Sequence, residues 1–286
     1  MRLNVKSIAR LLTPPLIVEL YRKLQQRGSQ TADNKSSPYL WQGIYKDHSD
    51  VPLIGSAFRS DWYVRHVSND VKDTIEEAKL PRTIPARVTC EHGLLPLLAA
   101  SVSSENGGSI RVLDFGGGLA PAYVHLTKGL AEPVSIEYHI VEIEEMCHIG
   151  RGLFEGDGRI HFYTSFPDVS GIDIIHSNGA LHCVPDYRAV LVRLCAYKAK
   201  HILFVRVYAG DVPTYATAQI NIPGTSMLCW FINVGELIEI MRSEGYRLVF
   251  KGAQHVHYDR SNFPPTHRVE HGCNLLFCRE SENDLQ

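Results

Sequence analysis

The chain has 286 residues, of which 44% are hydrophobic and 21% are charged, a composition typical of globular proteins. This length suits one large α/β domain with an appendage or two modest domains. The formal net charge of −2 gives no sign of a nucleic-acid-binding surface. The sequence contains no run of about 18 apolar residues, so no transmembrane helix is expected. Seven cysteines without a CxxC pair predict thiols in a reducing compartment, and hence a cytoplasmic protein.

Residues 1–28 are predicted to form a basic amphipathic helical segment. The apolar stripe of this segment consists of Leu16, Ile17, Leu20, Tyr21 and Leu24. Such a helix could rest on the anionic inner face of a membrane, as a peripheral contact. It could equally pack on the main domain, or on a second subunit in a homodimer. The short stripe and the interruption by Pro14 and Pro15 favour packing.

Residues 29–108 are predicted to form an N-terminal extension or cap. A polar stretch, S-Q-T-A-D-N-K-S-S-P, is typical of a loop or linker. Aromatic residues follow in W-Q-G-I-Y and D-W-Y-V-R, and helical patterns are expected near 66–79 and 91–103. The aromatic residues could form a lid over a pocket or the hydrophobic anchor of the extension, and the anchor is the more common arrangement.

Residues 109–286 are predicted to form an α/β domain, because strand and helix patterns alternate. The expected strands are Ile110–Phe115, Ile136–Val141, Ile160–Tyr163, Ile172–His176, His201–Val207, Arg247–Lys251 and Asn274–Cys278. Helical crossovers imply a mostly parallel sheet. A long segment without a helical pattern joins the last two strands, so the last strand is expected to be antiparallel.

Two helices of this domain have recognisable starts. Pro185 is expected in the first turn of a helix whose apolar face includes Tyr187 and Leu191. Asn233 and Glu236 form a capping-box pattern, and Gly245 is placed to end the helix that follows. The segment 208–229 is expected to cover an acceptor pocket, since it follows the fifth strand.

The stretch R-V-L-D-F-G-G-G-L-A-P-A-Y places three glycines directly after a predicted strand. No G-K-[ST] follows, so a P-loop is excluded. Aligned with the dinucleotide fingerprint G-x-G-x-x-G, the stretch has Pro121 where a small residue is needed. Asp114 would repel a pyrophosphate and favour a ligand with a positive charge. A nicotinamide oxidoreductase is therefore disfavoured.

The pattern D-x-G-x-G, formed by Asp114, Gly116, Gly117 and Gly118, resembles motif I of the class I S-adenosylmethionine-dependent methyltransferases. The resemblance covers about 109–280 and implies a Rossmann-like fold, S-adenosyl-L-methionine as cofactor and methyltransferase activity. In that family an acid ends the second strand and binds the ribose hydroxyls. Glu142 matches it, and Ile143 is then expected to flank the adenine.

The resemblance assigns further positions. Ser165, after the third strand, is the nearest match to the residue that contacts the adenine amine. Ser177 and Asn178 match motif IV, near the transferred methyl group. The chain also resembles a little-described group of bacterial proteins assigned as methyltransferases, with the same D-F-G-G-G turn, that are associated with surface-polysaccharide pathways.

His182 is the candidate general base, because an oxygen nucleophile benefits from a base and histidine serves most often. A packing role is the alternative. No metal is expected, since the histidines at 255, 257, 267 and 271 match no metal-ligand spacing. We expect O-methylation of a small-molecule acceptor, such as a carbohydrate or another polar compound. A non-catalytic methyltransferase-like binding or regulatory protein is the alternative.

Overall fold

The computed structural model describes residues 39–79, 93–130, 134–254 and 258–280. The predicted basic helix, its membrane or subunit contact and the boundary at residue 28 lie outside these ranges. Within the described ranges, no helix is both long and apolar enough to cross a bilayer.

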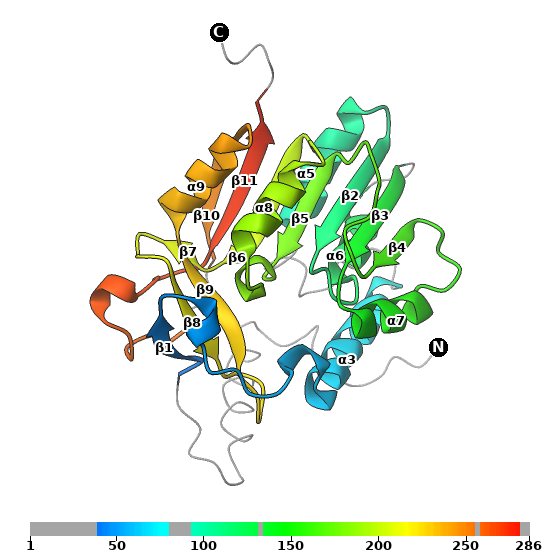
Figure 1. The fold of residues 1–286 in the computed structure, drawn as a ribbon. Coiled ribbons are helices and arrows are strands. Elements are labelled where there is room, and N and C mark those ends of the chain that lie inside the picture. The colour runs from blue at the N-terminus through cyan, green and yellow to red at the C-terminus, as the bar shows by residue number, and fades with distance from the viewer. Residues whose placement is uncertain (1–38, 80–92, 131–133, 255–257, 281–286) are drawn as a thin grey trace, which may run out of the picture. The chain divides into compact units, whose positions relative to one another are not determined.

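A seven-stranded sheet forms the centre of the described chain (Figure 1). Its strands are β2 (Ser109–Phe115), β3 (Ser135–Val141), β4 (Ile160–Tyr163), β5 (Ile174–Asn178), β6 (His201–Val207), β10 (Tyr246–Ala253) and β11 (Cys273–Arg279). Their order is β10-β11-β6-β5-β2-β3-β4. β11 runs antiparallel to both of its neighbours, β10 and β6, and all other neighbouring strands of this sheet pair in parallel. The predicted Rossmann-like sheet with a reversed last strand is therefore confirmed.

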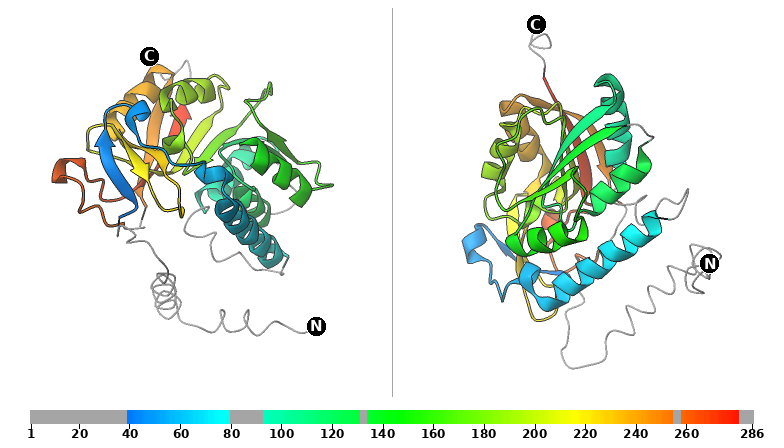
Figure 2. Two further views of the ribbon diagram at one scale, coloured as in Figure 1. Left: turned by 60° about the horizontal axis from the view of Figure 1, so that its bottom comes forward. Right: turned by 90° about the vertical axis from the view of Figure 1, so that its right-hand side faces the viewer.

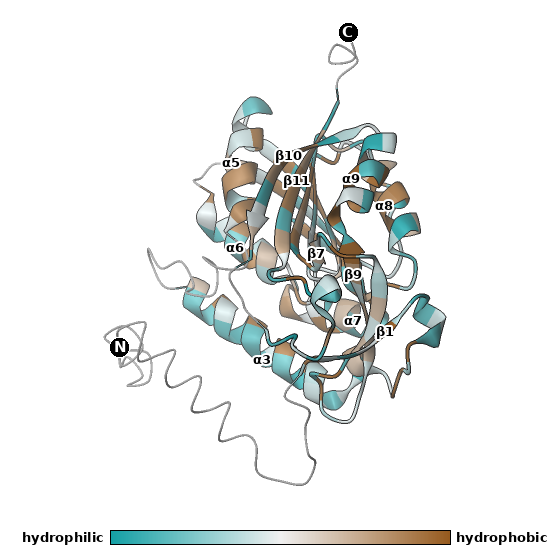
Figure 3. Cartoon of the chain, turned by 90° about the vertical axis from the view of Figure 1, so that its left-hand side faces the viewer, coloured by the Kyte–Doolittle hydropathy of each residue, from teal (hydrophilic) through white to brown (hydrophobic). Residues whose placement is uncertain are grey.

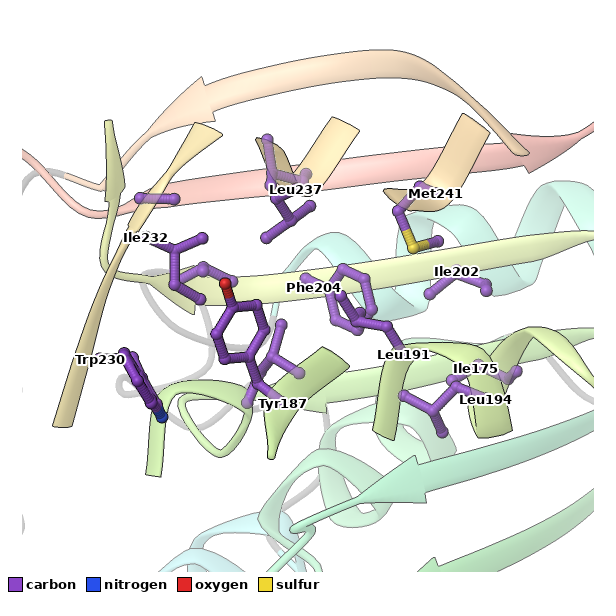
Figure 4. Close-up of a cluster of buried hydrophobic side chains, with 14 of the residues drawn as sticks. Ile175, Tyr187, Leu191, Leu194, Ile202, Phe204, Trp230, Ile232, Leu237 and Met241 are labelled. Atoms are coloured by element: carbon purple, nitrogen blue, oxygen red, sulfur yellow. The ribbon is translucent and has the colours of Figure 1, made fainter. Parts of the chain in front are cut away.

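Helices cover both faces of this sheet. They are α5 (Leu94–Glu105), α6 (Pro121–Gly129), α7 (Glu144–Leu153), α8 (Tyr187–Cys195) and α9 (Val234–Ser243). One buried cluster joins α5 and α6 to one face, and another joins α8 and α9 to the opposite face. In Figure 4, Leu191 of α8 and Met241 of α9 point toward Ile202 and Phe204 of β6. Full burial of each such side chain stabilises the fold by about 1.5–3 kcal/mol.

The helix starts agree with the sequence in part. The side chain of Asn233 accepts a hydrogen bond from the Glu236 backbone N–H at 3.0 Å, as the capping-box pattern predicts. Asp186 caps α8 by accepting from the Ala189 backbone N–H, and the helix begins at Tyr187. The expectation that Pro185 lies in the first turn is therefore wrong. The physical reason is that Asp186, one residue after Pro185, has a side chain that can accept the N-cap hydrogen bond, whereas proline has no such acceptor.

Other boundaries also differ from the expected ones. The strand expected at Ile172–His176 is β5, Ile174–Asn178, so both motif IV residues belong to the strand. The helix expected near 66–79 is α3 (Asp61–Ala78). It begins earlier because the Ser60 hydroxyl accepts a hydrogen bond from the Tyr63 backbone N–H.

A second, four-stranded sheet was not predicted. Its order is β1 (Trp41–Tyr45), β8 (Tyr215–Gln219), β9 (Met227–Asn233) and β7 (Ala209–Gly210). β1 pairs antiparallel with β8, and the chain from Tyr39 onward clusters as one compact unit. One strand of the segment predicted as an N-terminal extension or cap is therefore paired with a strand from the segment predicted as the α/β domain. The segment 208–229, expected to cover an acceptor pocket, supplies β7, β8 and the start of β9.

Helix α3 lies across the edge where β2 and β3 end, as the views of Figure 2 show. Its surface is mostly hydrophilic in Figure 3, and a narrow apolar stripe faces the domain. Val71 of this stripe is buried with Leu119, which follows the three glycines, and with Met146 of α7. This packing positions α3 over the part of the sheet where the glycine turn lies.

Candidate active site

The glycine turn joins β2 to α6. Gly116 has a positive φ of 69°, and a Cβ there would lie 2.1 Å from the Ala180 Cβ. A Cβ on Gly117 would lie 2.6 Å from Asp114 Oδ2. Gly118 also has a positive φ, 55°, but a Cβ there would meet no atom within 4 Å. Contacts inside the protein thus account for the first two glycines, and the third faces open space that a ligand can enter.

Pro121 is the residue that breaks the dinucleotide pattern. It is the first residue of α6, where its missing N–H costs nothing and its fixed φ suits the helix. Ala120 before it is the N-cap, with a left-handed φ of 64°. This conformation costs an L-residue about 1–2 kcal/mol. The turn is therefore held in a strained backbone shape by the strand before it and the helix after it.

Asp114, at the end of β2, is only 1% exposed. Its Oδ2 accepts a hydrogen bond from the Tyr138 hydroxyl at 2.7 Å, and its Oδ1 lies 2.8 Å from His176 Nδ1. Burial, with the charge of Asp114, raises the pKa of Tyr138 and keeps its hydroxyl a donor. Both carboxylate oxygens are thus engaged by the protein. A contact between Asp114 and a positively charged ligand stays a prediction.

Glu142 follows β3 directly and is half-buried. Its Oε1 accepts from the Ile143 backbone N–H at 2.9 Å, and its Oε2 accepts from the Gly118 backbone N–H at 3.3 Å. Burial raises the pKa of Glu142, while these two bonds oppose that rise. The structure therefore brings together the glycine turn and the acid that were predicted separately.

The remaining predicted cofactor residues lie at the ends of neighbouring strands. Ile143 is half-buried and packs in the cluster with α3, and Ser165 is exposed after β4. Ser177 is 1% exposed, and its hydroxyl has no hydrogen-bond partner among the described residues. Asn178 Oδ1 accepts from Arg206 Nε at 2.6 Å. These residues lie at or beside the carboxyl edge of the sheet, where ligands of open α/β sheets bind.

His182 belongs to a short 3₁₀ turn, Leu181–Cys183, after β5. It is 5% exposed, and its ring centroid lies 4.4 Å from that of Tyr208. Burial, and to a lesser extent the charge of Arg206, lower its pKa to about 3. The imidazole is therefore neutral and a weak base near neutral pH, which favours the packing role over the catalytic one.

Sequence reasoning did not single out Arg206 or Tyr138. Arg206 is the next-to-last residue of β6 and has a positive φ of 56°, and its backbone N–H donates to Asn274 Oδ1 at 3.0 Å. A single sequence does not show that Arg206 has a left-handed backbone conformation. It also does not show that the Tyr138 hydroxyl is hydrogen-bonded to Asp114. Tyr63 of α3, in contrast, belongs to the aromatic D-W-Y-V-R stretch, which the sequence marks as a candidate lid over a pocket.

The histidines of the last long loop are only partly described. His255 and His257 fall outside the described ranges, whereas His267 and His271 fall within them. Among the described residues, no three His, Cys, Asp or Glu side chains gather in a group that could hold a metal ion.

No family model matches the chain, and no curated protein matches it. Among solved structures, it is similar to the 1,6-didemethyltoxoflavin-N1-methyltransferase of Burkholderia thailandensis, with 18% identity and a TM-score of 0.46, over 81% of this chain and 95% of that one. An S-adenosylmethionine-dependent methyltransferase of Clostridium acetobutylicum gives 9% identity and 0.46, over 75% and 99%. The magnesium protoporphyrin IX methyltransferase of Synechocystis gives 11% and 0.44, over 76% and 97%. These similarities are too low to carry an argument about activity.

Proposed function

We propose that this protein binds S-adenosyl-L-methionine and transfers its methyl group to an oxygen of a carbohydrate or another small polar acceptor. The observation that carries the proposal is the link between Glu142 Oε2 and the Gly118 backbone N–H, 3.3 Å long, beside the open space at Gly118. This hydrogen bond holds the Glu142 carboxylate next to the glycine turn, which a ligand can approach closely.

The residues present fit this cofactor. A carboxylate can accept two hydrogen bonds from a vicinal diol such as ribose, and Glu142 retains lone pairs for them. Asp114 places a buried carboxylate against Gly117, which favours a positively charged ligand beside the turn. Ile143 and Ser165 would lie on the adenine side, and Ser177 and Asn178 on the side of the methyl group.

When bound, S-adenosyl-L-methionine supplies a methyl group carried by a sulfonium, for an in-line displacement. The protein must align the acceptor and exclude water. Helix α3, packed over Leu119 and Ile143, provides a cover for this purpose. His182 can act as a base only if its pKa rises when the acceptor binds. An acceptor carboxylate or acidic hydroxyl would need no base.

The buried, neutral His182 also supports the alternative function, a non-catalytic methyltransferase-like binding or regulatory protein. The two are separated by methyl transfer from labelled S-adenosyl-L-methionine to a panel of sugars and carboxylic acids. Transfer that is reduced in His182→Ala supports an enzyme with a histidine base. Cofactor binding without transfer to any acceptor class supports the alternative.

Cofactor binding itself is tested by calorimetry with S-adenosyl-L-methionine, S-adenosylhomocysteine and NAD. We expect the first two to bind and NAD not to bind. Binding of NAD without binding of the other two compounds would overturn the proposal. Asp114→Ala is a poor test variant, because it removes a buried partner of Tyr138 and His176 and so perturbs the fold. Membrane contact and homodimer formation remain predictions about residues outside the described ranges.

A further inference from the structure

Tyr63 is the aromatic residue of α3 that faces the glycine turn. Its ring belongs to the cluster that includes Leu119 and Ile143, and it packs edge-on against Phe58 with ring centroids 5.3 Å apart. Its position is fixed at the helix start, where its backbone N–H donates to the Ser60 hydroxyl at 3.2 Å. Tyr63 therefore reaches the site from a segment outside the resemblance to motif I.

A second contact holds the start of α3 against the cofactor side of the site. Arg59 Nε lies 3.0 Å from Glu145 Oε1, in the first turn of α7. That turn follows directly after Glu142 and Ile143. Both side chains of this ion pair are exposed, so it contributes little stability, but it links the residues just before α3 to the first turn of α7.

The hydroxyl of Tyr63 is a neutral donor in a charged surrounding. Burial and then the charge of Glu142 raise its pKa to about 12, with a smaller opposing effect from Arg206. Within the described residues, this hydroxyl makes no hydrogen bond. Tyr63 is half-buried and its hydroxyl is not closed off from solvent, so a ligand bound beside the turn can accept a hydrogen bond from it.

We infer that Tyr63 is a cofactor-contacting residue, whose ring packs on the adenosine half of S-adenosyl-L-methionine and whose hydroxyl donates a hydrogen bond to it. The juxtaposition with Ile143 and Glu142, the proposed adenine and ribose residues, selects this half of the cofactor. The inference rests on the proposed function, and it gives helix α3 a part in cofactor recognition.

The test is calorimetry on the full chain with two probes, S-adenosylhomocysteine and 5′-methylthioadenosine, which lacks the amino-acid part. Tyr63→Phe keeps the ring and removes the hydroxyl. We expect both probes to bind about three- to tenfold more weakly, the effect of one lost hydrogen bond. The adjacent Trp62→Phe is the matched control, since Trp62 is 46% exposed and stacks on His66. Its affinities should stay within about twofold of the wild type.

The outcomes distinguish this inference from the proposed function. If the wild type binds S-adenosylhomocysteine and Tyr63→Phe binds it equally well, the inference is wrong and the proposed function stands. If Tyr63→Phe weakens S-adenosylhomocysteine but not 5′-methylthioadenosine, the contact with the adenosine half is wrong. If the wild type binds neither probe, the proposed function and the inference fall together. Equal loss in Trp62→Phe would show a general disturbance of α3 and would also contradict it.

Discussion

Asp114 and His176 lie opposite each other on the neighbouring parallel strands β2 and β5, with Asp114 Oδ1 2.8 Å from His176 Nδ1. Tyr138 of β3 completes the arrangement by donating to the other carboxylate oxygen. Three adjacent strands of the sheet are thus joined by one buried carboxylate, directly below the glycine turn. The acid of the D-F-G-G-G motif also lies so close to the turn that a Cβ on Gly117 would come within 2.6 Å of Asp114 Oδ2.

The Tyr138 hydroxyl is therefore expected to stabilise the fold. Tyr138→Phe leaves a buried carboxylate oxygen without its donor, and we predict a loss of about 1–3 kcal/mol in the free energy of unfolding, measured by urea denaturation. Tyr123→Phe removes a hydroxyl that donates to the partly exposed Asp157, which also pairs with Arg159, and should cost less. Equal losses in the two variants would contradict the role given to Asp114.

The three glycines are expected to differ in what they do. Gly116→Ala would drive a Cβ into Ala180, so we predict a loss of stability of several kcal/mol, beyond the αL cost of about 1–2 kcal/mol. Gly118→Ala should lose only that αL cost, because the space beside it is open. It should nevertheless lose affinity for S-adenosylhomocysteine. Urea denaturation and calorimetry on both variants check this, and a folded Gly118→Ala with unchanged affinity would contradict it.

The sequence predicted the main sheet well because its strands are continuous apolar runs separated by helical patterns. Glu142 and the glycine turn were also predicted, since both lie at the carboxyl ends of strands. The second sheet was missed because β8, Y-A-T-A-Q, is too short and too rich in small residues to show a strand pattern. Its partner β1 lies more than 160 residues earlier in the chain, and such long-range pairing leaves no local signal.

Side-chain roles were harder to predict than strand positions. The place of His182 after the fourth strand of the domain favours a role as base, but a single sequence does not show that its ring is buried against Tyr208. The burial of Asp114 was hidden for the same reason, because Tyr138 and His176 come from different strands. Hydrogen-bond partners that lie far apart in the sequence and meet only in the fold can be identified only from the three-dimensional structure.

The low pKa of His182 makes stability depend on pH. In the unfolded chain its pKa is near the usual 6.5, whereas in the fold burial lowers the pKa to about 3. As pH falls below 6.5, the unfolded state gains a proton that the folded state does not bind, so stability falls. We predict that His182→Leu reduces the slope of unfolding free energy against pH, between pH 6 and 4.5, by up to about 1.4 kcal/mol per pH unit. An identical slope in both proteins would show that His182 is not buried as a neutral group.

Trp41 should anchor β1 to the rest of the domain. It is 1% exposed, its indole N–H donates to Gln219 Oε1 at 3.3 Å, and Arg260 lies over its ring with Cζ 5.0 Å from the centroid. Trp41→Ala should destabilise the whole unit by about 3–5 kcal/mol in one cooperative transition. A separate early transition for β1, seen by hydrogen exchange, would contradict the integration of the two sheets.

The most direct measurement of the central claim is calorimetric binding of S-adenosylhomocysteine to the wild type and to Glu142→Gln. The amide keeps the size of the side chain but loses the charge and one acceptor. We predict one site per chain in the wild type and about ten- to a hundredfold weaker binding in Glu142→Gln, as expected when charge-assisted hydrogen bonds are lost. Equal affinity in the two proteins, or no binding to a folded wild type, would contradict the account.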